Sequence, residues 1–409
     1  MVAPGMSYKG SRRGTLVVTL GTQMANPPRR RRQRPAGTVF RRRRRVAAAA
    51  LAAAAAAAAV AIEAATGDGR VGPTPGRIEE LRREAVPDRE LIGQRLMVRM
   101  DGVATPELAR QARAGEIGGV IAFPPPGQPA DGLAEEIAEL QREARRGGNP
   151  PLAVAIDQEG GEVKRLPDGP PERSPSELAA PGDEPAARRE GRATGRFLAG
   201  LGIDLDLAPV LDVPSSPSSF ISPRAFGADP RAVAANGVAF AEGLESGGAI
   251  PTAKHFPGLG RAIANTDLER SEIDASRRRL DEDLAPFREA IARGIPAVMS
   301  ANATYREIDP DLPASLSPAI VDGLLRGELG FDGAVITDDL GAGAVRALLA
   351  EPDAAVAAAR AGNDILLLAQ AADGGDALAA LEKAARRGEL ERADLERSAL
   401  RVLALKETR

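Results

Sequence analysis

Short apolar runs alternate with longer amphipathic stretches through most of the chain, and this alternation restricts the fold more than any other feature of the sequence. The eight apolar runs are residues 92–100, 118–123, 152–156, 203–211, 250–256, 297–300, 334–337 and 364–368. Strands that are apolar on both faces are typical of parallel sheets covered by helices. The pattern therefore predicts an α/β protein with parallel strands.

Helical patterns separate these runs. They cover residues 106–115, 132–146, 230–246, 280–293, 317–327 and 353–361, and a terminal pair follows at 376–387 and 392–406. Several begin at Pro or Asp and end at Gly, which are favoured at these helix ends. Eight strand–helix units in a single domain predict a (β/α)8 TIM barrel, and a doubly wound open sheet is the alternative.

Composition excludes several kinds of chemistry. The chain has 409 residues, of which 43% are apolar, but no Cys and a single His, His255. Disulfides, thiolate metal sites, cysteine nucleophiles and mechanisms with two imidazoles are therefore excluded. Because the sequence also lacks a phosphate-loop pattern, we expect no metal ion and no organic cofactor.

Charge is distributed unevenly along the chain. Residues 1–45 contain 13 of the 54 Lys and Arg and no acidic residue, so residues 46–409 contain 41 bases against all 57 acids. An excess of negative charge repels the phosphates of nucleic acids. We expect a disordered basic region at 1–45 and no nucleic-acid binding by the remainder.

Residues 46–62 follow two arginine runs and form an apolar, Ala-rich segment of 17 residues. This is the layout of an export signal, and the length is also near the minimum for a membrane span. We expect an extracytoplasmic protein, either secreted after cleavage or anchored to the membrane by this segment. The alternatives are an extension without a targeting role and a translation start at Met24.

Residues 63–90 are rich in Gly, Pro and charged residues. This composition is typical of a linker. The predicted barrel domain therefore spans residues 91–409. We expect no second domain after it, and a monomer.

Chemistry in a barrel gathers at the carboxyl ends of the strands. Four runs end in polar segments, at residues 157–161, 254–258, 300–305 and 337–340. A single polar residue there is equally explained by a helix cap, but carboxylate, ammonium and imidazole groups at one mouth predict a functional site. Lys254 and His255 are strand neighbours that point to opposite faces, so both line the mouth only where the strand ends or bulges.

Six motifs resemble, in the same order, those of the family 3 glycoside hydrolases, and among them the single-domain bacterial β-N-acetylhexosaminidases that trim cell-wall muropeptides. The motifs are IGQRLM at 92–97, DQEGG at 157–161 with VKRL at 163–166, DLAPVLDV at 206–213, RAFGADP at 224–230, KHFPG at 254–258 and TDDLG at 337–341. The resemblance extends over residues 90–409.

The resemblance implies a retaining glycoside hydrolase that forms a covalent intermediate on Asp338, the first Asp of the TDDL segment. It also implies that sugar hydroxyls are held by Asp157, Arg165, Arg224, Lys254 and His255. A carboxylate suits attack on an anomeric carbon, and surrounding charged groups grip hydroxyls more strongly as positive charge develops on the sugar. The implied partner is a carbohydrate substrate, a β-linked N-acetylglucosaminide of peptidoglycan fragments.

One motif departs from the family pattern. Hexosaminidases of the family carry Asp-Ser-His in the loop after the fifth strand, where the Asp and His act as acid/base, but this chain has Asn265, Thr266 and Asp267. Either Asp267 is the acid/base, or Glu269 or Glu272 of the same loop takes that role. The remaining alternative is a sugar-binding barrel with weak or no turnover.

A carboxyl group can replace the imidazole as acid/base only where its surroundings raise its pKa. Partial burial or a neighbouring negative charge such as that of Asp338 would act in this direction. Arg261 would act in the opposite direction if it folded over the loop.

Overall fold

The computed structural model describes residues 86–370 and 374–408. The predicted basic region 1–45, the apolar segment 46–62 and most of the predicted linker 63–90 lie outside the described residues. Within those two described stretches, none of the helices combines the length and apolar character that crossing a bilayer requires.

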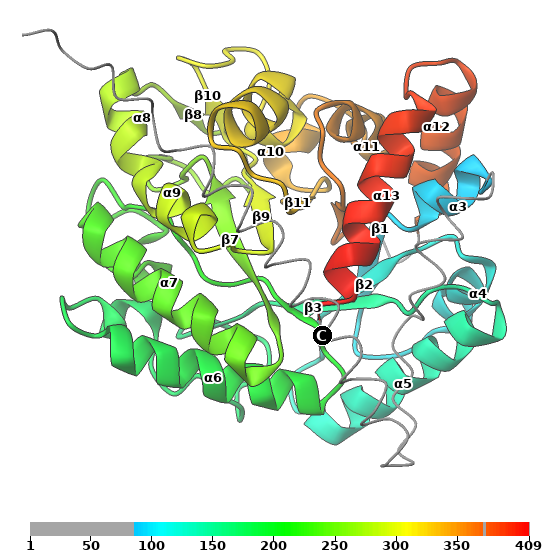
Figure 1. Ribbon diagram of the computed structural model, residues 1–409, viewed down its shortest axis with the longest axis horizontal. Helices are drawn as coiled ribbons and strands as arrows, with labels where there is room; N and C mark the ends of the chain where they lie inside the picture. Colours follow the sequence, from blue (N-terminus) through cyan, green and yellow to red (C-terminus); the bar gives the residue numbers. More distant parts are fainter. Residues whose placement is uncertain (1–85, 371–373, 409) are drawn as a thin grey trace, which may run out of the picture. The chain divides into compact units, whose positions relative to one another are not determined.

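Eight parallel strands form a barrel (Figure 1). In chain order they are β1 Leu96–Met100, β2 Gly119–Ala122, β3 Ala153–Ile156, β6 Leu205–Asp206, β7 Ile250–Phe256, β9 Ala297–Ser300, β11 Ala334–Thr337 and β12 Leu366–Leu368. Each strand pairs with the next in this order, β12 pairs with β1, and a bridge from Ile336 to Ile365 joins β11 to the start of β12. The (β/α)8 prediction is confirmed, and the open-sheet alternative is wrong.

Helices lie outside the strands (Figure 1). They are α3 Asp88–Gly93, α4 Pro106–Ala114, α5 Ala130–Arg146, α6 Glu184–Gly200, α7 Pro230–Gly247, α8 Arg277–Asp283, α9 Ala285–Ala292, η4 Ala319–Glu328, α10 Gly343–Arg346, α11 Glu351–Arg360, α12 Gly375–Arg386 and α13 Arg392–Lys406. Every predicted helical pattern contains a helix. The 280–293 pattern is divided into α8 and α9, and the 317–327 pattern is the π-helical segment η4.

Short elements fill the segments that follow the strands. They are the hairpin β4 Gln158–Gly160 with β5 Val163–Lys164, the pair β8 Glu272–Ile273 with β10 Thr304–Tyr305, and the single turns η1 Pro175–Leu178, η2 Ser222–Arg224 and η3 Ala314–Leu316. All of them follow the carboxyl ends of barrel strands. These short elements therefore lie at the mouth of the barrel, where the predicted site residues also lie.

The ends of α4 show how the sequence determines a helix. Thr105 accepts a hydrogen bond from the Leu108 amide at the start, and Pro106 occupies the first helical position. At the end, Gly115 has a φ of 69°, a left-handed conformation that side chains disfavour. These capping residues are the signals on which the helix prediction depends.

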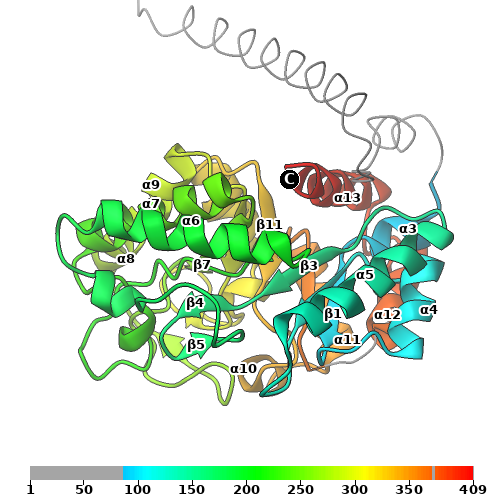
Figure 2. The same cartoon turned by 90° about the horizontal axis from the view of Figure 1, so that it is seen from below.

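Helix α6 is absent from the predicted segments because its buried face is made of small residues. A Cβ atom on Gly191 would lie 2.1 Å from the Phe240 carbonyl oxygen, and one on Gly195 would lie 2.4 Å from the Leu244 oxygen. Helices α6 and α7 therefore lie side by side with their backbones in close contact (Figures 1 and 2). Glycines that allow close packing carry no apolar signal in a sequence.

The first apolar run does not begin as a strand. Ile92 belongs to helix α3, and β1 starts at Leu96. Leu91 and Ile92 are buried on the inner face of α3, and Gln94 and Arg95 that follow are buried as well, so burial is continuous from the helix into the strand. The predicted strand start at residue 92 is therefore wrong.

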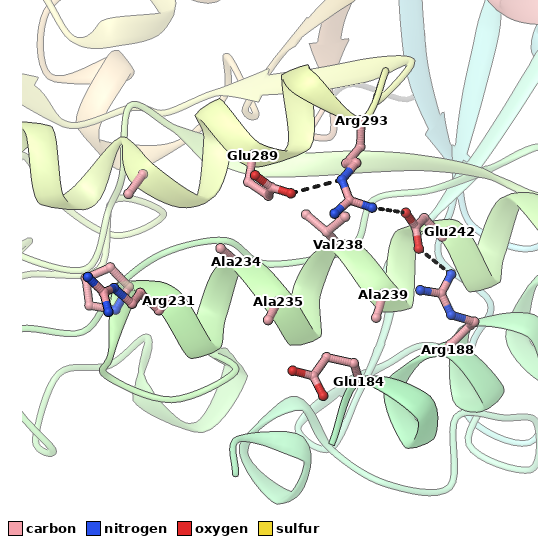
Figure 3. A pocket seen from close by; sticks show the side chains of 12 residues that line it. Glu184, Arg188, Arg231, Ala234, Ala235, Val238, Ala239, Glu242, Glu289 and Arg293 are labelled. Atoms are coloured by element: carbon pink, nitrogen blue, oxygen red, sulfur yellow. Dashed lines mark hydrogen bonds and ion pairs between the residues drawn. The ribbon is translucent and has the colours of Figure 1, made fainter. Parts of the chain in front are cut away.

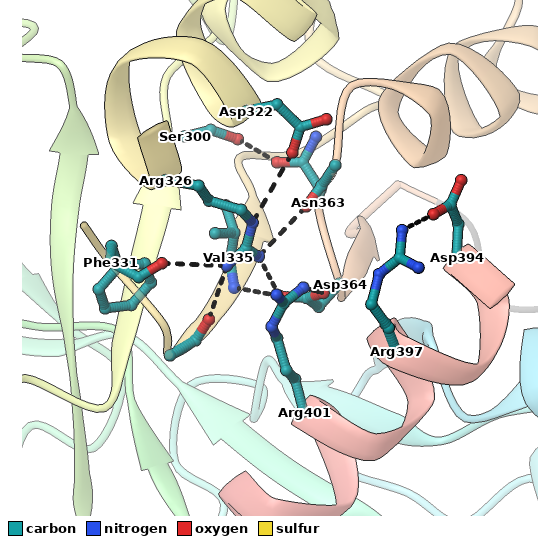
Figure 4. A network of polar contacts seen from close by, with 12 residues as sticks. Ser300, Asp322, Arg326, Phe331, Val335, Asn363, Asp364, Asp394, Arg397 and Arg401 are labelled. Atoms are coloured by element: carbon teal, nitrogen blue, oxygen red, sulfur yellow. Dashed lines mark hydrogen bonds and ion pairs between the residues drawn. The ribbon is translucent and has the colours of Figure 1, made fainter. Parts of the chain in front are cut away.

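A buried charge network joins β11 and β12 at the amino-terminal end of the barrel (Figure 4). Asp364 is completely buried and accepts hydrogen bonds from the Val335 amide (2.9 Å) and from Arg326 (2.5 Å). Arg401 of α13 lies 3.4 Å from its other oxygen, and Arg95 donates to the Asn363 carbonyl (2.8 Å). These contacts hold together the side of the ring that has few ladder hydrogen bonds.

The barrel interior is filled by apolar side chains. Near the carboxyl end the topmost of these are Ile121, Leu207, Met299 and Leu367, which also line a pocket above them. They form the apolar floor of this pocket, so a ligand in it would lie among the loops and strand ends.

Candidate active site

A pocket of about 200 Å³ opens above this floor at the carboxyl ends of the strands. All seven predicted site residues line it: Asp157, Arg165, Arg224, Lys254, His255, Asp267 and Asp338. They come from segments at the ends of β3, β6, β7 and β11. The fold thus brings residues that are far apart in the sequence into one small cavity.

One side of the pocket is lined by Asp157, Arg224 and Lys254, and Glu159 is buried behind them; these four residues of opposite charge are called here the paired wall. Lys254 Nζ lies 2.8 Å from Asp157 Oδ1 and 2.6 Å from Glu159 Oε1. Arg224 donates to both oxygens of Glu159, from Nε (2.9 Å) and Nη2 (2.7 Å). Glu159 and Lys254 are almost completely buried, so each charge depends on its partners.

Electrostatics keeps the paired wall ionised. Burial alone would raise the pKa of Glu159, but the charges of Arg224 and Lys254 lower it to about 2. Burial would lower the pKa of Lys254, yet the charges of Asp157 and Glu159 outweigh it and raise that pKa. Glu159 is not among the predicted site residues, although it holds Arg224 and Lys254 in place.

A further carboxyl group lies beneath this wall. Asp206 at the end of β6 is completely buried, and its Oδ1 accepts a hydrogen bond from the Gln158 amide (3.0 Å). Its Oδ2 has no hydrogen-bond partner among the residues that the structure describes. Burial raises the pKa of Asp206 to about 8, so at neutral pH it adds little negative charge below Lys254.

Lys254 and His255 both line the pocket because β7 is irregular at this point. The register between β7 and β9 shifts between Ala253 and Phe256, which confirms the expected interruption of the strand. His255 Nδ1 lies 2.7 Å from Asp212 Oδ2, and Asp212 Oδ1 accepts from the His255 amide (3.2 Å). This contact fixes the ring and leaves Nε2 as the nitrogen available to a ligand.

Another side of the pocket carries Asp267, Asp338 and Asp339, called here the carboxylate wall. Asp338 follows β11 and is partly exposed to the pocket. Burial raises the pKa of Asp338 to about 6, with His255 opposing the rise and Asp267 adding to it. Asp339 accepts hydrogen bonds from Gln370, Ala369 and Gly341, which hold it beside Asp338.

The loop after β7, which carries Asp267, is attached to the segment after Asp338. The Gly343 amide donates to the Asp267 carbonyl (2.8 Å), and the Ala344 amide donates to the Thr266 carbonyl (3.0 Å). These backbone bonds hold the exposed Asp267 side chain at the edge of the pocket.

The other charged residues of this loop lie away from the pocket. Neither Glu269 nor Glu272 lines it, and Glu272 is paired with Arg306 at 2.7 Å. Arg261 points to Asp283 (2.6 Å), so it does not fold over the loop as a counter-charge. Asp267 is thus the acidic residue of the loop that reaches the cavity.

Two further residues at the mouth, Arg99 and Phe123, are not among the predicted site residues. The Arg99 and Arg165 guanidinium carbons lie 4.2 and 4.8 Å from the centre of the Phe123 ring. Arg99, Phe123 and Arg165 all line the pocket. Cation–π contacts of this kind hold long side chains in defined positions.

A larger groove of about 510 Å³ lies on the outside of the barrel, between α6, α7 and α9 (Figure 3). Its floor is alanine-rich and its rim carries exposed ion pairs, such as that of Arg293 with Glu289 (2.9 Å). None of the predicted site residues lies there. In residues 86–370 and 374–408, no group of three or more His, Asp or Glu is arranged to hold a metal ion.

Comparison with known proteins agrees with the geometry. The model of the Glycosyl hydrolase family 3 N terminal domain matches residues 89–405. A secreted glycosyl hydrolase of Arthroderma benhamiae is 34% identical over 76% of this chain and 91% of its own length, and a beta-hexosaminidase of Nitrosomonas eutropha is 37% identical over 64% and 76%. The solved family 3 beta-N-acetylglucosaminidase of Paenibacillus sp. FPU-7 superposes with a TM-score of 0.75 at 36% identity, over 79% of this chain and 63% of that one.

Proposed function

The chain belongs to glycosyl hydrolase family 3 and is a β-N-acetylhexosaminidase-like glycoside hydrolase, and we propose that it removes β-linked N-acetylglucosamine from peptidoglycan fragments with retention of configuration. The observation that supports this proposal is the meeting of seven sugar-binding and catalytic candidates in one pocket of about 200 Å³. Sites for drug-sized ligands usually measure about 300–1,000 Å³. The smaller cavity favours a single sugar ring.

The paired wall is suited to grip this ring. Asp157 and Lys254 offer an acceptor and a donor that are already held in place by each other, and His255 offers Nε2. Arg165 is weakly attached to Asp157 (3.6 Å) and can also donate to a hydroxyl. Such preorganised groups cost little to orient when the sugar binds.

The carboxylate wall is suited to the reaction. We propose that Asp338 attacks the anomeric carbon while Asp267 donates a proton to the departing oxygen. A covalent glycosyl ester forms on Asp338 and the alcohol leaves with the proton. Asp267 then removes a proton from water, which attacks the ester and releases the sugar and free Asp338.

The alternative is a sugar-binding protein with weak or no turnover. It rests on the exposed side chain of Asp267, which stands at the position where the family resemblance implies a His. A carboxyl group with an ordinary pKa is almost fully ionised near neutral pH. It is therefore less often available as a proton donor there than an imidazole is. Both functions use the same paired wall, so the chemistry of the loop distinguishes them.

We also propose an extracytoplasmic monomer, secreted or anchored to the membrane through residues 46–62. The secreted Arthroderma relative supports export. The apolar segment that follows the arginine runs supplies the expected signal or anchor.

Azide rescue of Asp267→Ala tests the proposal. With a nitrophenyl N-acetylglucosaminide, the variant should still form the covalent intermediate, because a good leaving group needs little protonation. Hydrolysis should then stall, and azide, which needs no base, should restore turnover and yield the β-glycosyl azide. Glu269→Ala is the matched control, since it removes a carboxylate of the same loop that lies outside the pocket.

Two results would contradict parts of this proposal. Equal nitrophenol release by Asp267→Ala and the wild type, without an azide effect, would eliminate Asp267 while leaving Asp338 in place. No nitrophenol from the wild type between about pH 4 and 8, on glucosides or N-acetylglucosaminides, would favour the sugar-binding alternative.

A further inference from the structure

Three large apolar side chains are exposed within residues 86–370 and 374–408: Val103 (48% exposed), Ile263 (93%) and Leu268 (77%). All three lie on loops at the mouth of the barrel. Val103 follows β1, whereas Ile263 and Leu268 belong to the loop after β7 that carries Asp267. A single exposed apolar residue such as Val103 is ordinary on a protein surface, whereas several on one loop mark a candidate contact surface.

The backbone around Leu268 is held in place. The Leu268 amide donates to the Asn265 carbonyl (3.0 Å). A Cβ atom on Gly343 would lie 2.0 Å from the Leu268 carbonyl oxygen, so the loop packs directly on the segment after Asp338. The Leu268 side chain therefore projects from an attached backbone beside the pocket.

The position of these residues fixes what they can contact. The pocket of about 200 Å³ has room for one sugar ring, so the group bonded to the leaving oxygen must lie outside it. If Asp267 protonates that oxygen, the leaving group lies against the Asp267 loop. Leu268 follows Asp267 directly, Ile263 lies four positions before it in the same loop, and both side chains are exposed.

We propose that Ile263 and Leu268 form an apolar subsite for the leaving group, and that the enzyme prefers β-N-acetylhexosaminides whose leaving group carries an alkyl or aryl surface. This inference rests on the proposed function, because it places the leaving group beside Asp267. Burying these side chains against an apolar leaving group removes apolar surface from water, which favours binding.

A series of n-alkyl N-acetyl-β-glucosaminides, from ethyl to hexyl, tests the inference with the full chain. Their alcohols have nearly the same acidity, so the chemistry stays constant while apolar area grows. Each added CH₂ should raise kcat/KM by about two- to fourfold until the rim is covered. In the Ile263→Ser, Leu268→Ser double variant, kcat/KM should no longer rise with chain length. The matched control is Val103→Ser, on the loop after β1 across the ring from β7, and it should retain the rise.

Calorimetric affinity for the same series keeps the test independent of turnover. A wild-type series that is flat in both rate and affinity would overturn the inference, whereas hydrolysis of the ethyl glycoside would leave the proposed function intact. If no member is hydrolysed, the proposed function fails, yet affinity that rises with chain length and is lost in the double variant would still support the apolar subsite. A flat series together with binding to phosphatidylglycerol vesicles that the double variant loses would instead assign the residues to a lipid surface.

Discussion

The paired wall and the carboxylate wall lie in one pocket but have opposite electrostatics. Glu159 is more deeply buried than Asp338, yet its pKa is lowered to about 2 while that of Asp338 is raised to about 6. Burial acts in the same direction on both groups. The difference comes from their neighbours, which are Arg224 and Lys254 for Glu159 and the carboxylates Asp267 and Asp339 for Asp338.

This difference matches the two tasks that we propose for the walls. Groups that hold a sugar work best when their charges are constant, and opposite charges at 2.6–2.9 Å make them so. A nucleophile that must attack and later leave works best when its carboxylate is not over-stabilised. Substitutions that remove one charge from each wall therefore test whether the tasks are separate.

The largest effect is expected from Asp338→Asn. The amide cannot act as nucleophile, so kcat/KM on aryl N-acetylglucosaminides should fall by about 10⁴-fold or more. The free energy of unfolding at neutral pH should not fall, because the change removes a negative charge that lies near the carboxylates of Asp267 and Asp339. Asp332→Asn, an exposed Asp near the start of the same strand, is the control. Residual activity near the wild-type level would reassign the nucleophile.

Glu159→Gln should break the paired wall. The change leaves Arg224 and Lys254 buried without their shared carboxylate, and removing one member of a buried ionic group typically costs about 3–5 kcal/mol. Because the pKa of Glu159 is lowered, its stabilising contribution is present above the unfolded pKa near ~4.5 and is lost as pH falls toward 2. The variant should lack this part of the acid dependence.

Urea unfolding of Glu159→Gln at pH 7 and in acid measures both effects. Glu162→Gln, an exposed neighbour in the turn between β4 and β5, serves as the control. Equal free energies of unfolding for the two variants would mean that Glu159 does not organise the wall.

The fold was largely predictable because parallel strands covered on both faces leave continuous apolar runs. All eight strands were located in this way. Helix α6 was missed because its packing depends on Gly191 and Gly195, and the start of β1 was misplaced because α3 is apolar up to Ile92. Both errors come from packing between elements, which a local pattern does not contain.

The sequence could predict which residues line the pocket, but not which of their charged side chains pair with one another. Motif resemblance supplied the seven pocket residues, whereas the bond from Arg224 to Glu159 joins residues 65 positions apart. Arg261 was considered as a counter-charge over the loop but pairs with Asp283. Which charges meet depends on the arrangement of the strand ends, so the contrast between the two walls appears only in the structure.

The smallest expected effect is a shift in the pH dependence of the first chemical step, on the acidic side of its profile (the acidic limb). It is also the sharpest test of the contrast between the two walls. In the proposed mechanism only ionised Asp338 attacks, so the burst of dinitrophenol from an activated substrate should fall as pH drops through about 6. Asp267→Asn removes a charge that raises this pKa and should move the limb to lower pH by up to about one unit, which equals about 1.4 kcal/mol. His255→Gln removes a charge that lowers it and should move the limb to higher pH, while Glu269→Gln, outside the pocket, should leave it in place. Identical pH profiles in all four proteins would mean that the neighbours of Asp338 do not set its pKa, and burial alone would then account for the raised pKa of Asp338.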